Sequence, residues 1–106
     1  MGFFSYLWGS NQSRYSTVEH YLTEIEIKKL VSHLTVQSID SNDEGVIEPA
    51  LVARRHGDGK ISLRQISDTL KQLQNQNKIS KYDREGLMRV FQNYFNDKFG
   101  ENNLSI

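Results

Sequence analysis

The segment 57–66 constrains the fold more than any other part of this chain. Asp58 and Gly59 provide a tight turn within it, because glycine adopts positive φ at little steric cost. Ile61 then stands as a single apolar residue of β-like character, and Ser62 precedes an amphipathic stretch. A turn, one extended residue and a capped helix in this order are typical of the exit from the loop of a helix–loop–helix module.

The composition excludes several classes of protein. A chain of 106 residues suits a single domain with a modest core. Its 13 basic and 13 acidic side chains cancel, whereas a domain that mainly binds nucleic acid usually has a basic excess. The chain has no cysteine, which excludes disulfides, thiolate zinc sites and cysteine nucleophiles, and we expect a cytoplasmic protein. No stretch reaches the roughly twenty apolar residues that span a bilayer.

The beginning of the chain is rich in large apolar side chains, which are Phe3, Phe4, Tyr6, Leu7 and Trp8. No basic region precedes them, so the segment is a poor signal peptide. We expect residues 1–15 to form an aromatic N-terminal segment with a linker, and residues 16–106 to form the folded domain. Three placements of the aromatic side chains are open: on the domain's own core, in a partner's groove, or at a membrane surface through residues 3–8.

Capping pairs and apolar periodicity predict the helices. Three serine residues have an acidic or amide residue three positions later, namely Ser16 with Glu19, Ser62 with Gln65, and Ser80 with Asp83. The apolar spacing that follows them predicts helices over 17–37, 63–74 and 83–97. Turn-forming residues over 40–45 end the first helix, and Pro49 begins a short helix that continues to residue 55. The predicted fold is all-α, with at most short β contacts between loops.

The segment 40–51 can be aligned with a twelve-residue calcium loop. Its oxygen-bearing side chains at the first, third, fifth and ninth positions are Asp40, Asn42, Glu44 and Glu48. Gly45 falls at the sixth position, where the loop turns sharply, but Leu51 takes the twelfth, which normally holds a bidentate glutamate. The segment is therefore a calcium candidate that lacks a ligand. The other interpretation is a solvated acidic loop with Asx turns.

A second alignment with a calcium loop begins at Arg54. It places His56, Asp58, Gly59, Ile61 and Ser62 at the third, fifth, sixth, eighth and ninth positions. The first position then carries a guanidinium and the twelfth carries the amide of Gln65. Because a cation at the first position opposes a divalent ion directly, we expect this loop not to bind calcium.

From Gly57 onwards the chain resembles the calmodulin-like EF-hand superfamily, with degenerate calcium loops. The resemblance lies in residues 57–62, the helix that follows them, the polar linker 74–77 and the helix after it. It implies a small EF-hand-like bundle that holds a partner helix or peptide in an apolar groove. Ile47 and Ile61 are fourteen positions apart, which is too close for two consecutive complete modules. Either 40–51 is an insertion in one loop, or 56–61 is a linker that mimics a loop.

No catalytic motif is present in the sequence. We find no nucleophile elbow, phosphate-binding loop, zinc-binding helix motif or plausible triad. The three histidines, His20, His33 and His56, do not share the spacing of a metal-ligand set. We therefore expect a chain that is not an enzyme and has no cofactor, unless the segment 40–48 holds calcium.

The expected function is protein–protein recognition by an adaptor or regulatory subunit. The expected partner-binding side chains are large and apolar, and they are Phe3, Phe4, Trp8, Leu70, Leu73, Met88, Phe91 and Phe95. The aromatic residues of the last helix also fit a hydrophobic core. Two other functions are open: a calcium sensor that uses the 40–48 loop, and a winged-helix or helix-turn-helix domain. In the latter the side chains that face phosphates are Lys81, Arg84 and Arg89.

Overall fold

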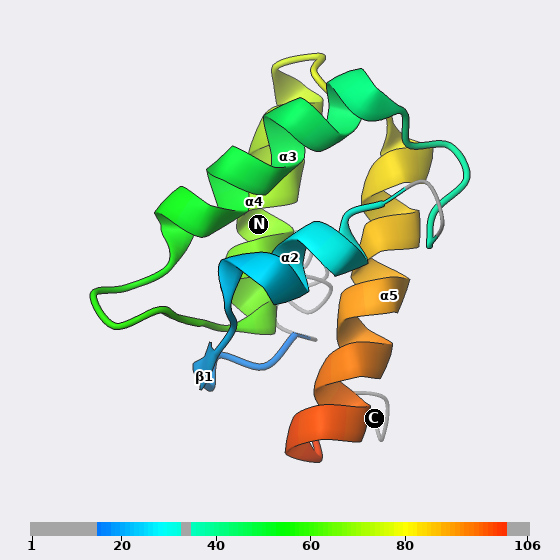
Figure 1. The fold of residues 1–106 in the computed structure, drawn as a ribbon. Coiled ribbons are helices and arrows are strands. Elements are labelled where there is room, and N and C mark those ends of the chain that lie inside the picture. Colours follow the sequence, from blue (N-terminus) through cyan, green and yellow to red (C-terminus); the bar gives the residue numbers. More distant parts are fainter. Residues whose placement is uncertain (1–14, 33–34, 102–106) are drawn as a thin grey trace, which may run out of the picture.

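The computed structural model describes residues 15–32 and 35–101 of the chain (Figure 1). The elements in chain order are β1 (His20–Tyr21), α2 (Glu24–Leu30), α3 (Ser41–Arg54), β2 (Lys60–Ile61), α4 (Leu63–Asn75) and α5 (Lys81–Phe99). Within these residues the protein is mostly helical, with four helices and one antiparallel pair of two-residue strands. The predicted fold class, all-α with a short β contact between loops, is confirmed.

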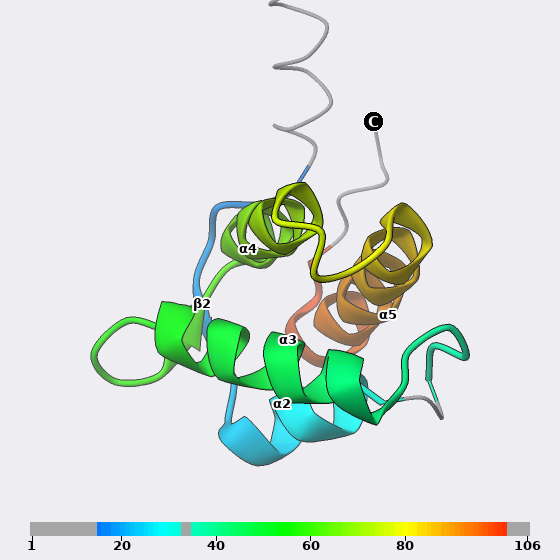
Figure 2. The ribbon, with the colours of Figure 1, turned by 90° about the horizontal axis from the view of Figure 1, so that it is seen from above.

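α4 and α5 pack as a helical hairpin, and α3 and α2 pack against it. α4 and α5 lie side by side, α3 crosses α4, and α2 packs on the side of α3 that faces away from α4 and also contacts α5 (Figures 1 and 2). The core fills the space between them with apolar side chains from all four helices. Among the described helices, none is long and apolar enough to cross a membrane.

The strand pair joins two segments that are far apart in the sequence. His20 pairs with Ile61 and Tyr21 with Lys60, and the ladder continues with a 3.0 Å hydrogen bond from Leu22 N to Gly59 O. Gly59 has a φ of +98°, a left-handed conformation that favours glycine. The strand pair therefore fixes the start of α2 against the turn that connects α3 to α4.

Each described helix begins with a capping box, in which the N-cap side chain and the side chain three residues later bond each other's backbone amides. The four pairs are Thr23 with Glu26, Asp40 with Asp43, Ser62 with Gln65, and Ser80 with Asp83. An N-cap of this kind stabilises a helix by about 0.5–2 kcal/mol. The last two pairs were predicted from the sequence, and α4 and α5 begin and end within about two residues of the predicted bounds.

The helix predicted over 17–37 is wrong. Its first part contains β1, and α2 covers only Glu24–Leu30. Ser16 does not cap a helix, because its Oγ accepts a 3.0 Å hydrogen bond from the amide of Val18 in an extended segment. The helix is instead capped by Thr23 with Glu26. This pair lies inside the stretch 17–37, whose apolar spacing predicted one longer helix.

The loop predicted at 40–51 is also wrong, because this segment is the greater part of α3. Asp40 caps the helix, and Ile47 and Leu51 contribute to the core. Pro49 lies inside α3 and does not begin a short helix. A proline there leaves one helical carbonyl without its usual donor and costs about 3 kcal/mol, so the cap and the buried side chains must outweigh this cost.

Candidate functional site

A groove of about 520 Å³ lies between α5 and the segment 35–38, which precedes α3. From α5 it is lined by Tyr82, Glu85, Gly86, Arg89, Val90 and Asn93. These positions recur every three or four residues, with two adjacent pairs among them, so they form one face along about three turns of the helix. The opposite wall comes from Thr35, Val36, Gln37 and Ser38.

A buried carboxylate attaches this segment to α5. Asp83 is only 5% exposed, and its Oδ1 accepts a hydrogen bond of 2.5 Å from Ser38 Oγ. Its Oδ2 accepts from the amide of Ser80 at 3.0 Å, as part of the capping box of α5. One side chain therefore caps the helix and also fixes the second wall of the groove.

The groove floor depends on a close contact between Val36 and Gly86. A Cβ on Gly86 would lie 2.9 Å from Val36 Cγ1, which is closer than real carbon atoms approach. Any larger residue at this position would push the segment 35–38 away from α5. The glycine thus allows the two walls to meet at an apolar floor, to which Val90 also contributes.

The rim of the groove carries polar side chains that have no partner among the described residues. The side chains of Gln37, Arg89 and Asn93 are exposed and make no hydrogen bond or ion pair with the rest of the described chain. Tyr82 at one end is 76% exposed. Glu85 lies 4.0 Å from Lys81 on the same helix. The groove therefore combines an apolar floor, an accessible aromatic ring and one unpaired cation.

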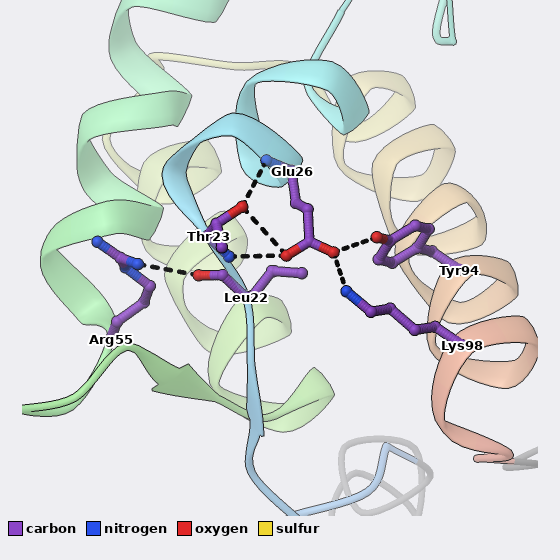
Figure 3. Close-up of polar contacts among 6 residues, drawn as sticks. All are labelled: Leu22, Thr23, Glu26, Arg55, Tyr94 and Lys98. Carbon is purple, nitrogen blue, oxygen red and sulfur yellow. Dashed lines mark hydrogen bonds and ion pairs between the residues drawn. The ribbon is translucent and has the colours of Figure 1, made fainter.

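A second polar network fixes the other end of α5 (Figure 3). Glu26 Oε2 accepts hydrogen bonds from Tyr94 and Lys98, and its Oε1 accepts from the amide of Thr23 at 2.9 Å. Burial by itself raises the pKa of Glu26, but the hydrogen bonds from Lys98, Thr23 and Tyr94 outweigh it and lower the pKa from 4.5 to about 2. This network ties the C-terminal part of α5 to the first turn of α2.

Arg55 connects the end of α3 with the start of α2 (Figure 3). Its guanidinium donates a 2.9 Å hydrogen bond to the carbonyl of Leu22 and lies 3.5 Å from the carboxylate of Glu24. The same guanidinium lies 3.3 Å from where a Cβ on Gly59 would stand. A cationic side chain thus lies in the turn that was aligned with a calcium loop.

The four residues predicted as calcium ligands lie on or next to α3. Asp40 Oδ1 accepts a 2.9 Å hydrogen bond from the amide of Asp43, and Asn42, Glu44 and Glu48 follow along the helix. The loop geometry on which the calcium alignment depended is therefore not present. Within the ranges 15–32 and 35–101, no group of three or more histidine, aspartate or glutamate side chains could hold a metal ion.

The structure places five of the predicted partner-binding residues in the core, and these are Leu70, Leu73, Met88, Phe91 and Phe95. None of them is more than 7% exposed. The space that was expected to be an open groove between these helices is filled by the core itself. The other three predicted residues, Phe3, Phe4 and Trp8, lie outside the described residues.

Exposed apolar side chains also occur near β1, at Val18, Tyr21 and Ile25. Tyr21 is partly engaged, because its hydroxyl donates to Asp58 and the Lys60 ammonium lies 4.9 Å from its ring centroid. These residues do not line the groove. They make a second exposed surface, on a different part of the fold from the groove.

Sequence reasoning missed the groove, for two reasons. The segment 35–38 was assigned to the end of a long helix, so it was not available as a wall. Tyr82 and Asn93 were not singled out in the sequence, because the interpretation of this helix concentrated on its apolar and basic side chains. Arg89 was noted only as a side chain that could face phosphates. The available signal was that these three positions share one helical face with Gly86.

Comparison of the chain with known protein families, with characterised proteins and with solved structures finds no match. A functional interpretation therefore depends on the geometry of the groove and on the chemistry of its rim.

Proposed function

We propose that this domain is a non-catalytic protein–protein interaction module, an adaptor or a regulatory subunit, and that it binds a peptide segment of a partner in the groove between α5 and 35–38. The observation that carries the proposal is the groove itself. Its floor is apolar at Val36, Gly86 and Val90, and its rim presents Tyr82 and an unpaired arginine, Arg89. Sites that bind ligands typically combine an apolar lining with a few polar groups that fix orientation.

The dimensions of the groove suit a short extended segment. The face from Tyr82 to Asn93 covers eleven residue-to-residue steps of helix, which corresponds to about 16 Å at 1.5 Å per residue. An extended peptide advances about 3.3 Å per residue, so about five residues would follow this face. The exposed amides of Gln37 and Asn93 stand on opposite walls, where they can bond the backbone of such a segment.

We further propose that the domain is EF-hand-like, without a working ion site. In the alignment that begins at Arg54, Gly59 takes the sixth position, and its positive φ supports the sharp turn expected there. Ile61 takes the eighth position and lies in β2, and Ser62 takes the ninth and caps α4. The unit α3–β2–α4 then corresponds to an entering helix, a loop and a leaving helix.

Two features support calcium-independent behaviour of that unit. The side chain of Gln65, at the twelfth position, uses its Oε1 to accept a 2.9 Å hydrogen bond from the amide of Ser62. The guanidinium of Arg55 donates a hydrogen bond to the carbonyl of Leu22. It therefore connects the turn after α3 with the start of α2 without an ion. In the sequence, Ile47 and Ile61 are too close for the loops of two consecutive modules. This conflict does not arise in the proposal, because Ile47 lies inside α3 and does not belong to a second loop.

The test is selection of peptides from a random displayed library on the complete chain, followed by mapping of amide chemical shifts with the selected peptides. We expect shifts at 35–38 and along the groove face of α5. Replacement of the exposed ring in Tyr82→Ala should remove most of the binding. Tyr21→Ala is the matched control, because it also removes an exposed tyrosine ring but from β1.

Two outcomes would contradict the proposal. If the library yields no peptide that binds the folded chain, the groove does not recognise peptides. If binding survives Tyr82→Ala but is lost in Tyr21→Ala, the recognition surface is the one near β1 and not the groove.

A further inference from the structure

The charges around the groove indicate what kind of segment it selects. We infer that the groove selects a partner segment with an aspartate or glutamate side chain, and that Arg89 binds its carboxylate. This inference rests on the proposed function. Among the described residues that line the groove, Arg89 is the only cation. Its side chain is exposed and has no partner within the described chain.

Arg89 makes no ion pair with the described residues, which is unexpected from its position on the helix. Glu85 precedes it by four residues, a spacing that favours an ion pair between glutamate and arginine. The Glu85 carboxylate instead lies 4.0 Å from Lys81, on the preceding turn. The remaining carboxylate nearby, Asp83, is buried and is bonded by Ser38 and by the cap of α5. Within the described chain, no carboxylate of the groove therefore neutralises Arg89.

The chemistry of a guanidinium makes a carboxylate the complementary group. Arginine presents a planar fork of donors that can bind both oxygens of a carboxylate at once. Asn93 lies four residues further along the same face, where its amide can bond the same ligand. A basic segment would instead meet Arg89 with like charge, which disfavours it.

The spacing along α5 predicts the pattern of the selected segment. Tyr82 and Arg89 are seven residues apart, which is about 10 Å along the helix. An extended segment covers that length in about three residues. The expected pattern is therefore an apolar or aromatic residue that packs on Tyr82, with an acidic residue about three positions away that reaches Arg89.

The experiment uses the peptides selected on the complete chain and measures their dissociation constants by titration. Arg89→Gln should weaken binding by about fivefold, since an exposed charge pair with good geometry contributes at most about this factor. Glu85→Gln should strengthen binding by about twofold, because it removes a negative charge from the same groove. Arg54→Gln is the matched control, an exposed arginine outside the groove, and should change nothing.

Salt provides a second readout. Raising the salt concentration from about 50 to 300 mM should weaken peptide binding by the unchanged chain. The same change should have much less effect on Arg89→Gln, because salt screens the charge pair that this variant lacks. Arg89 and Glu85 are on the rim and not in the core, so amide spectra of the folded variants should match those of the unchanged chain.

The outcomes separate this inference from the proposed function. Selected peptides without enrichment in acidic residues, or peptides whose affinity does not change in Arg89→Gln, would overturn the role of Arg89 while the groove still binds peptides. If no selected peptide binds, or if binding does not depend on Tyr82, the proposed function fails and this inference fails with it.

Discussion

Val36 packs directly onto Gly86, and the space between them leaves no room for even one additional methyl group. The contact brings the segment 35–38 to the face of α5 that carries Tyr82 and Arg89. It therefore connects a single small residue in the middle of a helix to the existence of the groove.

Gly86→Ala should destabilise the domain and disturb the groove. Alanine favours the helix by about 1 kcal/mol over glycine, but overpacking in a tight contact costs about 1–3 kcal/mol. We expect a net loss of about 1 kcal/mol in the free energy of unfolding, measured with urea, together with weaker peptide binding. Gly45→Ala is the control, because nothing lies within 4 Å of the added Cβ in α3, and it should stabilise by about 0.5–1 kcal/mol. Equal effects of the two substitutions would show that the Val36 contact is not tight.

The pKa of Glu26 predicts a loss of stability in acid. The folded chain holds this pKa at about 2, whereas the ordinary value is 4.5, so between pH 4.5 and 2 the unfolded chain binds more protons. The contribution is complete above pH 4.5 and is lost as the pH falls towards 2. Its size is on the order of 1–3 kcal/mol.

The measurement is urea unfolding at a series of pH values for the unchanged chain and for Glu26→Gln. Glutamine keeps the capping box with Thr23 but carries no charge for Lys98. The difference in unfolding free energy between the two proteins should shrink as the pH falls from 4.5 to 2. A difference that stays constant over this range would mean that the Glu26 carboxylate gains nothing from its partners.

Arg55→Met should destabilise the connection between α2 and α3. The substitution leaves the carbonyl of Leu22 without its donor and removes the cation near Glu24. Hydrogen bonds from charged groups contribute about 1.5–3 kcal/mol, and we expect a loss in the lower part of this range because Glu24 is largely exposed. Arg54→Met, at the adjacent exposed position, should be nearly neutral. If both variants unfold at the same urea concentration, the Arg55 contact adds no stability.

Calcium should not bind to the segment 40–48. Asp40 already accepts a hydrogen bond from the amide of Asp43, and Asp43 Oδ2 accepts one from the amide of Asp40 at 3.1 Å. A calcium loop would require this helical turn to unfold. Titration of the metal-free domain should therefore give amide shifts no larger than those of an ionic-strength control. Saturable shifts from Asp40 to Glu48 would instead indicate a calcium sensor.

The sequence predicted the second half of the fold well, because local signals there agree with each other. Ser62 and Ser80 each have a capping partner three residues later, and the apolar spacing that follows belongs to one helix in each case. Gly59 also has the positive φ that the turn requires. Where cap, periodicity and turn residues coincide, helix boundaries follow from short stretches of sequence.

The first half was less predictable because its signals conflict. Asp40 to Gly45 has the composition of a turn, but the same Asp40 and Asp43 cap a helix whose buried side chains lie further along, at Ile47 and Leu51. β1 depends on its partner β2, some forty residues later, and no local pattern marks it. The groove could not be predicted for a similar reason, since its walls meet through tertiary contacts, those of Ser38 with Asp83 and of Val36 with Gly86.

The double role of Asp83 has a consequence for motion. The same carboxylate closes the first turn of α5 and holds the segment 35–38, so displacement of that segment also loosens the start of the helix. Amide hydrogens at Ser80 and Asp83 should therefore exchange with solvent at rates that follow the opening of the groove. A bound peptide that presses the two walls together would slow the exchange of these two amide hydrogens without contacting them.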